Sequence, residues 1–373
     1  MKFIHTADWH LGKMVHGISM IEDQRFILQG LIRLIEREQP DALVIAGDLY
    51  DRSVPPASAV NLLNETLFTI NVEMNVPIVA ISGNHDSSER LAFGSTWFRQ
   101  NRFYLAGKME KDMFCPVIEG VHFHCLPYAE PGVIRHLFDD DSVHTHHDAM
   151  NVLTGRLSEN MDSDGIHVAV GHAFVTGGET SDSERILSVG GTGNVGVELF
   201  APFQYTALGH LHNPQAIHHP SVKYAGSLLK YSFSEAAHTK SVSIVEIDAQ
   251  KQVSVTKETL KPVREMKVMA GYFDELMEQD ASDDYIKVII KGEGALIDPM
   301  AKLKYKFPHI LHLEKMSAAP TAFESAASTK KKQNELELFQ EFYHAMTGLP
   351  FLEEKRAYMT TVLEEAKKED SRL

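Results

Sequence analysis

The sequence has little cysteine, no long apolar run and a shortage of positive charge. Only Cys115 and Cys125 occur in 373 residues, which excludes a disulfide framework and an all-cysteine zinc site. No stretch approaches the roughly 18 apolar residues that a membrane-spanning helix needs. Asp8 lies where a signal peptide has its apolar segment. We therefore expect a cytoplasmic protein.

The shortage of positive charge limits how this chain could bind nucleic acid. It has 36 lysines and arginines against 51 acidic residues, a formal net charge of −15. Proteins that bind nucleic acid through their overall field are usually basic, because phosphate neutralisation supplies most of the affinity. A nucleic-acid role would need a local site, bound metal ions or a basic partner. The 20 histidines stand out, because histidine is the commonest transition-metal ligand.

Short apolar runs alternate with amphipathic helical patterns in the first part of the chain. Residues 2–8, 41–46 and 77–82 read as strands, and residues 22–38 and 57–74 as helices. Strands separated by helices of this length pair in parallel, which predicts an α/β fold. Further strands are expected at 167–170, 205–208, 242–247 and 253–258.

A change of pattern near Pro262 predicts a second, smaller domain. We expect a main domain over 1–260, a small α+β domain over 261–316, a linker over 317–332 and a helical tail over 333–373. Apolar stripes predict two tail helices, at about 333–346 and 352–367. These could dock on a partner or pack on the chain's own domain.

Polar side chains of the kind that bind metals follow five of the predicted strands. They are Asp8, His10, Asp48, Asn84, His85, Asp86, His172, His210 and His212. In open α/β sheets, sites form beyond the carboxyl ends of strands, and the glycines before several of these residues allow tight turns there. Each short motif is weak alone, since such turns are common. Five of them at five strand ends indicate one site.

The types of side chain indicate which ions this site would hold. Imidazole, carboxylate and amide groups without thiolate suit manganese, iron or zinc, and there are too many for one ion. Two ions that share a carboxylate would use them all, and such a pair promotes phosphoester hydrolysis. His144, His146 and His147 lie in a polar stretch and are expected in a solvated loop rather than in a third metal site.

These motifs resemble those of the calcineurin-like metallophosphoesterases. Within that family, residues 207–215, 224–227 and 231–235 are similar to stretches of the nuclease subunits of double-strand-break repair complexes. Residues 47–52 would also fit protein phosphatases, but their third motif usually ends in Glu where this chain has Asp86. The resemblance implies a β-sandwich flanked by helices, a small α+β capping domain that faces DNA, and a C-terminal helical hairpin.

The resemblance also implies a role for each site residue. Asp8, His10, Asp48 and His212 would hold one ion, and Asn84, His172 and His210 would join a bridging Asp48 at the second. His85 corresponds to the catalytic histidine that contacts phosphate without binding metal. Asp86 would either orient His85 or cap the turn, and the sequence leaves both alternatives open.

The activity implied by the resemblance is that of a metal-dependent DNA nuclease. We expect two manganese ions per chain, with Mg²⁺ or Fe²⁺ as alternatives, 3′-to-5′ exonuclease action on duplex ends, and endonuclease action on single strands and hairpins. The expected partners are DNA, a second copy of the chain and an SMC-like ATPase. Two alternatives remain: a phosphodiesterase or phosphatase for another substrate, and a non-catalytic scaffold for the ATPase.

Overall fold

The structure is a computed structural model that describes residues 1–178, 180–184, 193–292 and 296–316, with separate positions of the tail between 336 and 362. It divides into two compact units. The first comprises Met1–Ile290 with Leu296–Glu314, and the second comprises Lys291–Ala295 with Lys315–Leu373. Of the helices in the described part, none is long and apolar enough to span a membrane.

The first sheet of the larger unit has six strands in the order β15–β14–β1–β4–β5–β6. In chain order they are β1 (Lys2–Thr6), β4 (Ala42–Ala46), β5 (Ile78–Ile81), β6 (Phe103–Ala106), β14 (Val242–Ile247) and β15 (Val253–Glu258). Strands β1, β4, β5 and β6 pair in parallel, and β14 is antiparallel to both β1 and β15. The predicted parallel pairing is confirmed.

The second sheet has five strands in the order β13–β12–β9–β8–β7. They are β7 (Val117–Ile118), β8 (Val121–Leu126), β9 (Ile166–His172), β12 (Tyr205–Gly209) and β13 (Val222–Tyr224). Strands β8, β9, β12 and β13 pair in parallel. Two short pairs, β2 (Met14–Val15) with β3 (Ile18–Ser19) and β10 (Phe174–Val175) with β11 (Asn194–Val195), lie outside the two sheets.

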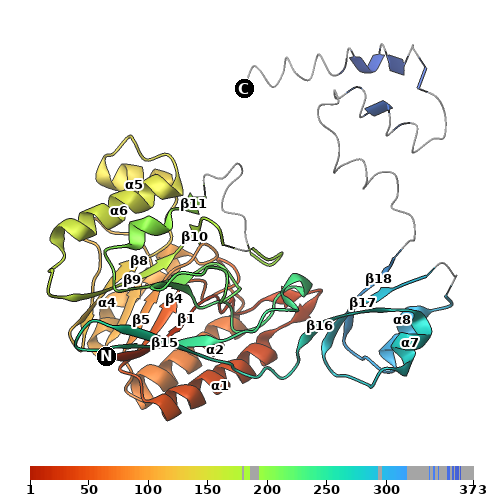
Figure 1. Cartoon of the computed structure of the whole chain (residues 1–373), viewed down its shortest axis with the longest axis horizontal. Coiled ribbons are helices and arrows are strands. Elements are labelled where there is room, and N and C mark those ends of the chain that lie inside the picture. Colours follow the sequence, from red (N-terminus) through yellow and green to blue (C-terminus); the bar gives the residue numbers. More distant parts are fainter. Residues whose placement is uncertain are drawn as a thin grey trace. The chain divides into compact units, whose positions relative to one another are not determined.

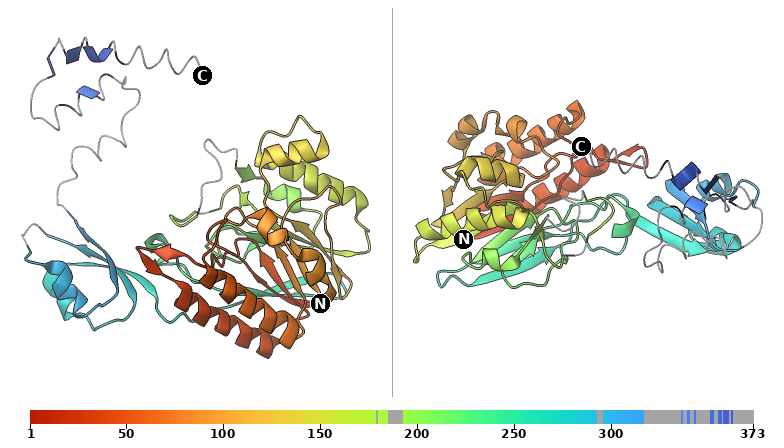
Figure 2. Two further views of the ribbon diagram at one scale, coloured as in Figure 1. Left: turned by 180° about the vertical axis from the view of Figure 1, so that it is seen from behind. Right: turned by 90° about the horizontal axis from the view of Figure 1, so that it is seen from above.

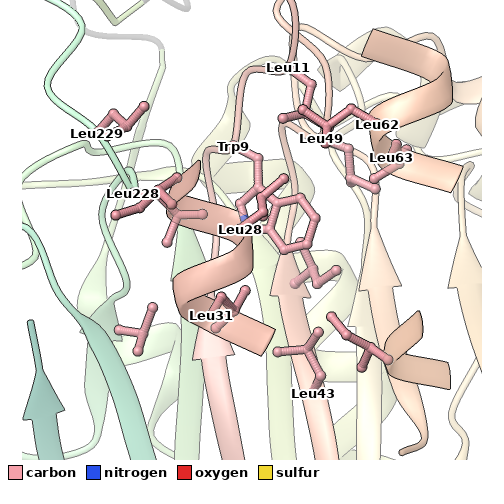
Figure 3. Close-up of a cluster of buried hydrophobic side chains, with 14 of the residues drawn as sticks. Trp9, Leu11, Leu28, Leu31, Leu43, Leu49, Leu62, Leu63, Leu228 and Leu229 are labelled. Atoms are coloured by element: carbon pink, nitrogen blue, oxygen red, sulfur yellow. The ribbon is translucent and has the colours of Figure 1, made fainter. Parts of the chain in front are cut away.

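The two sheets pack face to face with helices outside them (Figures 1 and 2). Val44 and Ala46 of β4 face the core between the sheets, whereas Leu43 and Ile45 belong to a second buried cluster with α1 (Ile21–Glu38) and α2 (Ala57–Phe68). Figure 3 shows this second cluster around Trp9. A third cluster packs α5 (Pro131–Phe138) and α6 (His146–Asn160) on the other sheet. The expected helix-flanked β-sandwich is confirmed.

Helix α6 corrects one expectation from the sequence. His146 and His147 are its first residues and do not belong to a solvated loop. Thr145 caps the helix: its hydroxyl accepts from Asp148 N (3.1 Å), and Asp148 accepts in turn from Thr145 N (2.8 Å). In the sequence, this capping box is visible as a Thr three residues before an Asp.

Shorter helices complete the larger unit. They are the π-helical turn Thr69–Glu73 after α2, α3 (Ser88–Ala92), α4 (Ser95–Phe98), α7 (Phe273–Glu278) and α8 (Pro299–Lys304), with 3₁₀ turns at Arg99–Asn101, Val197–Phe200 and Phe233–Glu235. Helices α7 and α8 pack on a separate sheet of β16 (Met266–Gly271), β17 (Tyr285–Ile290) and β18 (Ile310–Lys315). Tyr285 OH donates to Asp23 of α1 (2.9 Å), which ties this sheet to the sandwich.

The predicted tail helices lie mostly outside the described residues. Leu336, Phe339 and Tyr343 are helical where the structure describes them. The ring of Phe351 lies 5.7 Å from that of Phe339 and 5.2 Å from that of Tyr343. The apolar stripe expected for the first tail helix therefore makes aromatic contacts within its own unit.

Candidate metal centre

The ends of five strands from the two sheets bring the predicted ligands together. Asp8 and His10 follow β1, Asp48 follows β4, Asn84 follows β5, His172 ends β9, and His210 and His212 follow β12. All of these except Asn84 are at most 5% exposed. Buried carboxylates and imidazoles at this density need compensating charge or hydrogen bonds.

One group of these side chains surrounds Asp8. The ligand atoms of Asp8, His10 and His212 all lie within 4.8 Å of one another. The Nε2 atoms of His10 and His212 are 3.0 Å apart. A neutral imidazole has one N–H and one lone pair on its two ring nitrogens, so at most one hydrogen bond can form between these two Nε2 atoms. A cation between them would accept both lone pairs.

A second group lies around His172. Its Nε2 is 2.9 Å from Asn84 Oδ1, which is also 3.1 Å from His210 Nδ1. His172 Nδ1 donates to Ala46 O (2.9 Å), so in the neutral ring Nε2 carries the lone pair. Acceptor atoms therefore converge here as well.

Asp48 lies between the two groups. Its Oδ2 is 3.5 Å from His10 Nε2 and 3.4 Å from His172 Nε2. Its Oδ1 accepts from His85 N (2.8 Å), which fixes the plane of the carboxylate. One oxygen of Asp48 is therefore near an imidazole from each group, as a bridging ligand requires.

The backbone around the site is strained. Asp8, His10, Asp48 and His210 all have positive φ, at 54°, 45°, 51° and 105°. Such conformations cost roughly 1–3 kcal/mol each in residues other than glycine and cluster at functional sites. The strain aims side chains from neighbouring strand ends at one point.

Two glycines are required by close approach. A Cβ on Gly209 would lie 2.0 Å from Ala46 O and 2.8 Å from His172 Nδ1. A Cβ on Gly83 would lie 2.2 Å from Asp48 Oδ1. The glycines before these ligands therefore let neighbouring strand ends touch, in addition to allowing turns.

The pKa values of the buried site residues show that the site favours bound positive charge. Burial alone would raise the pKa of Asp48, but His172 and His10 lower it below its usual range. Burial would lower the pKa of His172, yet Asp48 and Asp8 raise it to about 9. Burial raises the pKa of Asp8 to about 7 against the opposing effect of His172 and His212. Protons held at His172 and Asp8 occupy positions that a metal ion would take.

An unpaired atom gives a direct test of whether the residues fit a metal. Asp8 Oδ2 is buried and lacks a hydrogen-bond partner among the described residues. An unpaired buried polar atom is costly, so a carboxylate oxygen in this state indicates an absent ligand. The mixed nitrogen and oxygen donor set also suits manganese or iron. The residues therefore fit divalent ions.

His85 lies beside the site. Its Nδ1 donates to Asp51 O (2.8 Å), and its ring centroid is 4.7 Å from that of His10. Asp86 does not hold this ring: its carboxylate accepts from Leu49 N (3.1 Å), Tyr50 N (2.9 Å) and Gly83 N (3.0 Å). These contacts favour the turn-capping alternative for Asp86.

Sequence reasoning missed several side chains that support the site. Gln24 donates to His10 O (2.8 Å) and Trp9 O (3.2 Å), so α1 holds the loop after β1. Glu235 is fully buried next to His212. Glu235 lies in the stretch 231–235 that had suggested the family, but no pattern in the sequence indicated its contact.

Comparisons with known proteins show which families this chain matches. The family described as Calcineurin-like phosphoesterase matches residues 1–214, and the family described as Type 5 capsule protein repressor C-terminal domain matches residues 262–347. The chain is 38% identical to the SbcD subunit of nuclease SbcCD from Staphylococcus epidermidis over 351 residues, which cover 93% of this chain and 94% of that protein. It is also 38% identical to the SbcD subunit from Staphylococcus saprophyticus, over 99% of this chain and 100% of the relative.

Proposed function

This chain belongs to the SbcD family of nuclease subunits, whose catalytic domain is a calcineurin-like phosphoesterase, and from that premise we propose that it hydrolyses DNA phosphodiester bonds at a two-metal centre. The observation that carries the proposal is the position of Asp48, with one carboxylate oxygen near imidazoles of two ligand groups. An intact ligand set of this kind argues against a purely structural scaffold.

In this proposal the two ions share one ligand, Asp48. Asp8, His10, Asp48 and His212 would hold one ion, and Asp48, Asn84, His172 and His210 would hold the other. The family uses divalent metals, and the donor set supports Mn²⁺, with Mg²⁺ or Fe²⁺ as alternatives. When bound, two such ions withdraw charge from the phosphate oxygens and make water a stronger nucleophile.

His85 is proposed to act on the substrate without binding metal. Because its Nδ1 donates to Asp51 O, Nε2 is the ring nitrogen available to a phosphate oxygen or to the leaving group. The peptide N–H of the same residue donates to Asp48 Oδ1. The backbone of His85 therefore fixes this side chain relative to the bridging carboxylate, and Asp86 holds the turn that carries it.

The DNA substrate and the ATPase partner are proposed from the family and from charge. The names of the relatives describe one subunit of a complex, so we propose an SbcC-like SMC ATPase as the partner of this chain. A net charge of −15 opposes binding of long duplex DNA by the chain alone. We propose 3′-to-5′ exonuclease action on duplex ends with the partner, and endonuclease action on single strands and hairpins.

A homodimer is supported by an exposed apolar face on α2, α3 and α4. Phe68, Phe93 and Trp97 are 52%, 76% and 67% exposed. Phe68 and Phe93 line a groove of about 500 Å³ together with Leu67 and Phe98, and the ring of Trp97 lies 6.2 Å from that of Phe93. Exposed apolar surface of this kind ordinarily marks a protein interface. We propose that this face contacts a second copy of the chain, within a complex of two nuclease and two ATPase chains.

The segments predicted from the sequence receive roles in the same proposal. Residues 1–260 form the nuclease domain, 261–316 the DNA-facing capping domain, 317–332 the linker, and 333–373 the tail that contacts the ATPase. The partner-binding role of the tail rests on its apolar stripes, because its helices lie mostly outside the described residues.

Cleavage assays test the proposed reaction. Linear duplex DNA, single-stranded DNA and the chromogenic diester bis(p-nitrophenyl) phosphate would be incubated with the chain and Mn²⁺, with and without EDTA. We expect EDTA-sensitive cleavage of single-stranded DNA and loss of all cleavage in Asp48→Ala. Cleavage of the diester with intact DNA would indicate another phosphodiesterase. No metal-dependent cleavage of any substrate, alone or with the partner, would indicate a scaffold.

A further inference from the structure

Four side chains form one connected hydrogen-bonded series that begins at His212. His212 Nδ1 lies 2.7 Å from Ser183 Oγ and 3.5 Å from Glu235 Oε1. The hydroxyl of Ser183 donates to Glu235 Oε1, and Lys240 Nζ donates to Glu235 Oε2. The opposite nitrogen of His212, Nε2, faces His10 and the metal centre.

Three of the four members of the series are shielded from water. Glu235 is 0% exposed, Lys240 is 7% exposed and His212 is 1% exposed. Lys240 Nζ also donates to His212 O (2.7 Å) and Ser227 Oγ (2.8 Å). A buried ion pair adds little net stability compared with apolar residues of the same volume. The buried pair of Glu235 and Lys240 is therefore better explained by its effect on His212.

Hydrogen positions follow from the partners. The Ser183 hydroxyl gives its hydrogen to the Glu235 carboxylate, so its oxygen accepts from His212. That requires the hydrogen of the neutral imidazole to be on Nδ1, which leaves the Nε2 lone pair directed at the centre. His172 is held in the same tautomer by a backbone carbonyl, whereas His212 depends on side chains that can be substituted.

We propose that Glu235, acting through Ser183 and held by Lys240, is a positioning residue that fixes the tautomer and orientation of His212 for metal binding. This inference rests on the proposed function, because it takes His212 as a ligand. Partners of ligating histidines typically contribute 10- to 100-fold in metal affinity. Ser183 brings the segment 181–184 into the site, although no motif in the sequence indicates a role for that segment.

Ser183 could also affect metal binding only because it helps the segment 181–184 to pack in place. The experiment must distinguish this explanation from a direct effect on His212. Asp182 N donates to Ser234 Oγ (3.0 Å), and His212 N donates to Glu184 Oε1 (2.6 Å). Ser234→Ala removes one docking contact but leaves both partners of His212 Nδ1 in place. It is the matched control for Ser183→Ala, since each variant loses one hydroxyl where the segment 181–184 contacts residues 234–235.

The test measures Mn²⁺ affinity of the full-length chain by competition with a fluorescent chelator, without any DNA. Ser183→Ala leaves no buried charge unpaired, so it should fold, and thermal unfolding checks this. We expect Ser183→Ala and Glu235→Gln to weaken one of two Mn²⁺ sites roughly 10- to 100-fold. Ser183→Thr, which keeps the hydroxyl, and Ser234→Ala should bind like the unmodified chain.

A second measurement reads the tautomer directly. In metal-free protein with ¹⁵N-labelled histidine, we expect the His212 ring nitrogens of the unmodified chain to report hydrogen on Nδ1, and Ser183→Ala to shift toward a mixture of tautomers. Unchanged Mn²⁺ affinity in a folded Ser183→Ala, or an equal loss in Ser234→Ala, would overturn the inference. Failure of the unmodified chain to bind Mn²⁺ would instead overturn the proposed function.

Discussion

At the scale of single residues, the site divides into side chains that the sequence could identify and side chains that only the fold identifies. Asp8, Asp48 and His172 follow or end strands, and a strand end is visible in a sequence as an apolar run that stops at a polar residue. Glu235 and Ser183 lie 52 positions apart and meet only in the folded chain. No local pattern indicates such a pair, so sequence reasoning finds ligands more readily than their supports.

His85→Ala separates binding from chemistry. The side chain of His85 is assigned to the substrate, and its peptide N–H, which the variant keeps, donates to Asp48. We expect unchanged Mn²⁺ content and DNA affinity with a roughly 10²- to 10⁴-fold lower cleavage rate, the usual scale for a lost general acid. Metal analysis and single-turnover cleavage check this. If the variant purifies without metal, His85 is a ligand and the assignment is wrong.

His5 gives the fold a defined pH dependence. Its ring is fully buried, accepts from Tyr205 OH (2.9 Å) and donates to Leu208 O (3.2 Å), and burial lowers its pKa to about 3. The unfolded chain takes up this proton near pH 6.5, so the contribution of His5 to stability is complete above that pH and is lost as the pH falls toward 3.

His5→Gln removes this titration while it keeps a polar side chain. The free energy of unfolding of the unmodified chain, minus that of the variant, should fall by up to about 1.4 kcal/mol for each unit that the pH drops between about pH 6 and pH 4. Urea unfolding of both metal-free proteins at several pH values measures this difference. If the free energies of unfolding of the two proteins changed with pH in parallel, His5 would not stay neutral in the folded chain.

At the scale of elements, strands were predicted well where apolar runs were clean. The parallel pairing of β1, β4 and β5 followed from the alternation of strands and helices. Strand β8 and helix α5 were not singled out, because their apolar residues are interrupted by polar ones whose burial depends on the rest of the fold. His124 of β8, for example, is 6% exposed beside His167 of β9.

The apolar face of α2, α3 and α4 carries a prediction of its own. Phe93→Glu with Trp97→Glu places charge on two exposed positions, so the fold should persist while self-association is lost. Light scattering after gel filtration should give twice 41.8 kDa for the unmodified chain and 41.8 kDa for the variant. Tyr305→Glu, at a 95% exposed residue directly after α8, is the matched control and should remain dimeric. An unmodified chain that is monomeric at micromolar concentration would contradict the proposal.

At the scale of the whole molecule, the acidic charge and the buried metal centre imply a division of labour. In the proposed function the chain supplies the chemistry, and we propose that a partner binds long duplex DNA. The sequence predicted this division in outline, because composition gives the net charge and motifs indicate the site. The placement of the tail could not be predicted, since amphipathic stripes fit both a partner and the chain's own surface.

Removal of residues 317–373 tests the tail. Because the site is built within residues 8–240, we expect the truncated chain to keep Mn²⁺ binding and single-strand cleavage. It should lose binding of the coiled-coil ATPase and the ATP-stimulated degradation of duplex ends. Pull-down of the ATPase by full-length and truncated chains checks this, and equal recovery would mean that the tail packs on its own protein.

The central claim is that Asp48 joins two metal ions in one centre, and Mn²⁺ titration followed by electron paramagnetic resonance tests it most directly. The unmodified chain should bind two ions with the signal of a spin-coupled pair, because one carboxylate oxygen lies near ligands of both groups. Asp48→Ala should lose the coupled signal and weaken both ions together. Two uncoupled ions in the unmodified chain, or one tightly bound ion retained in Asp48→Ala, would contradict the account.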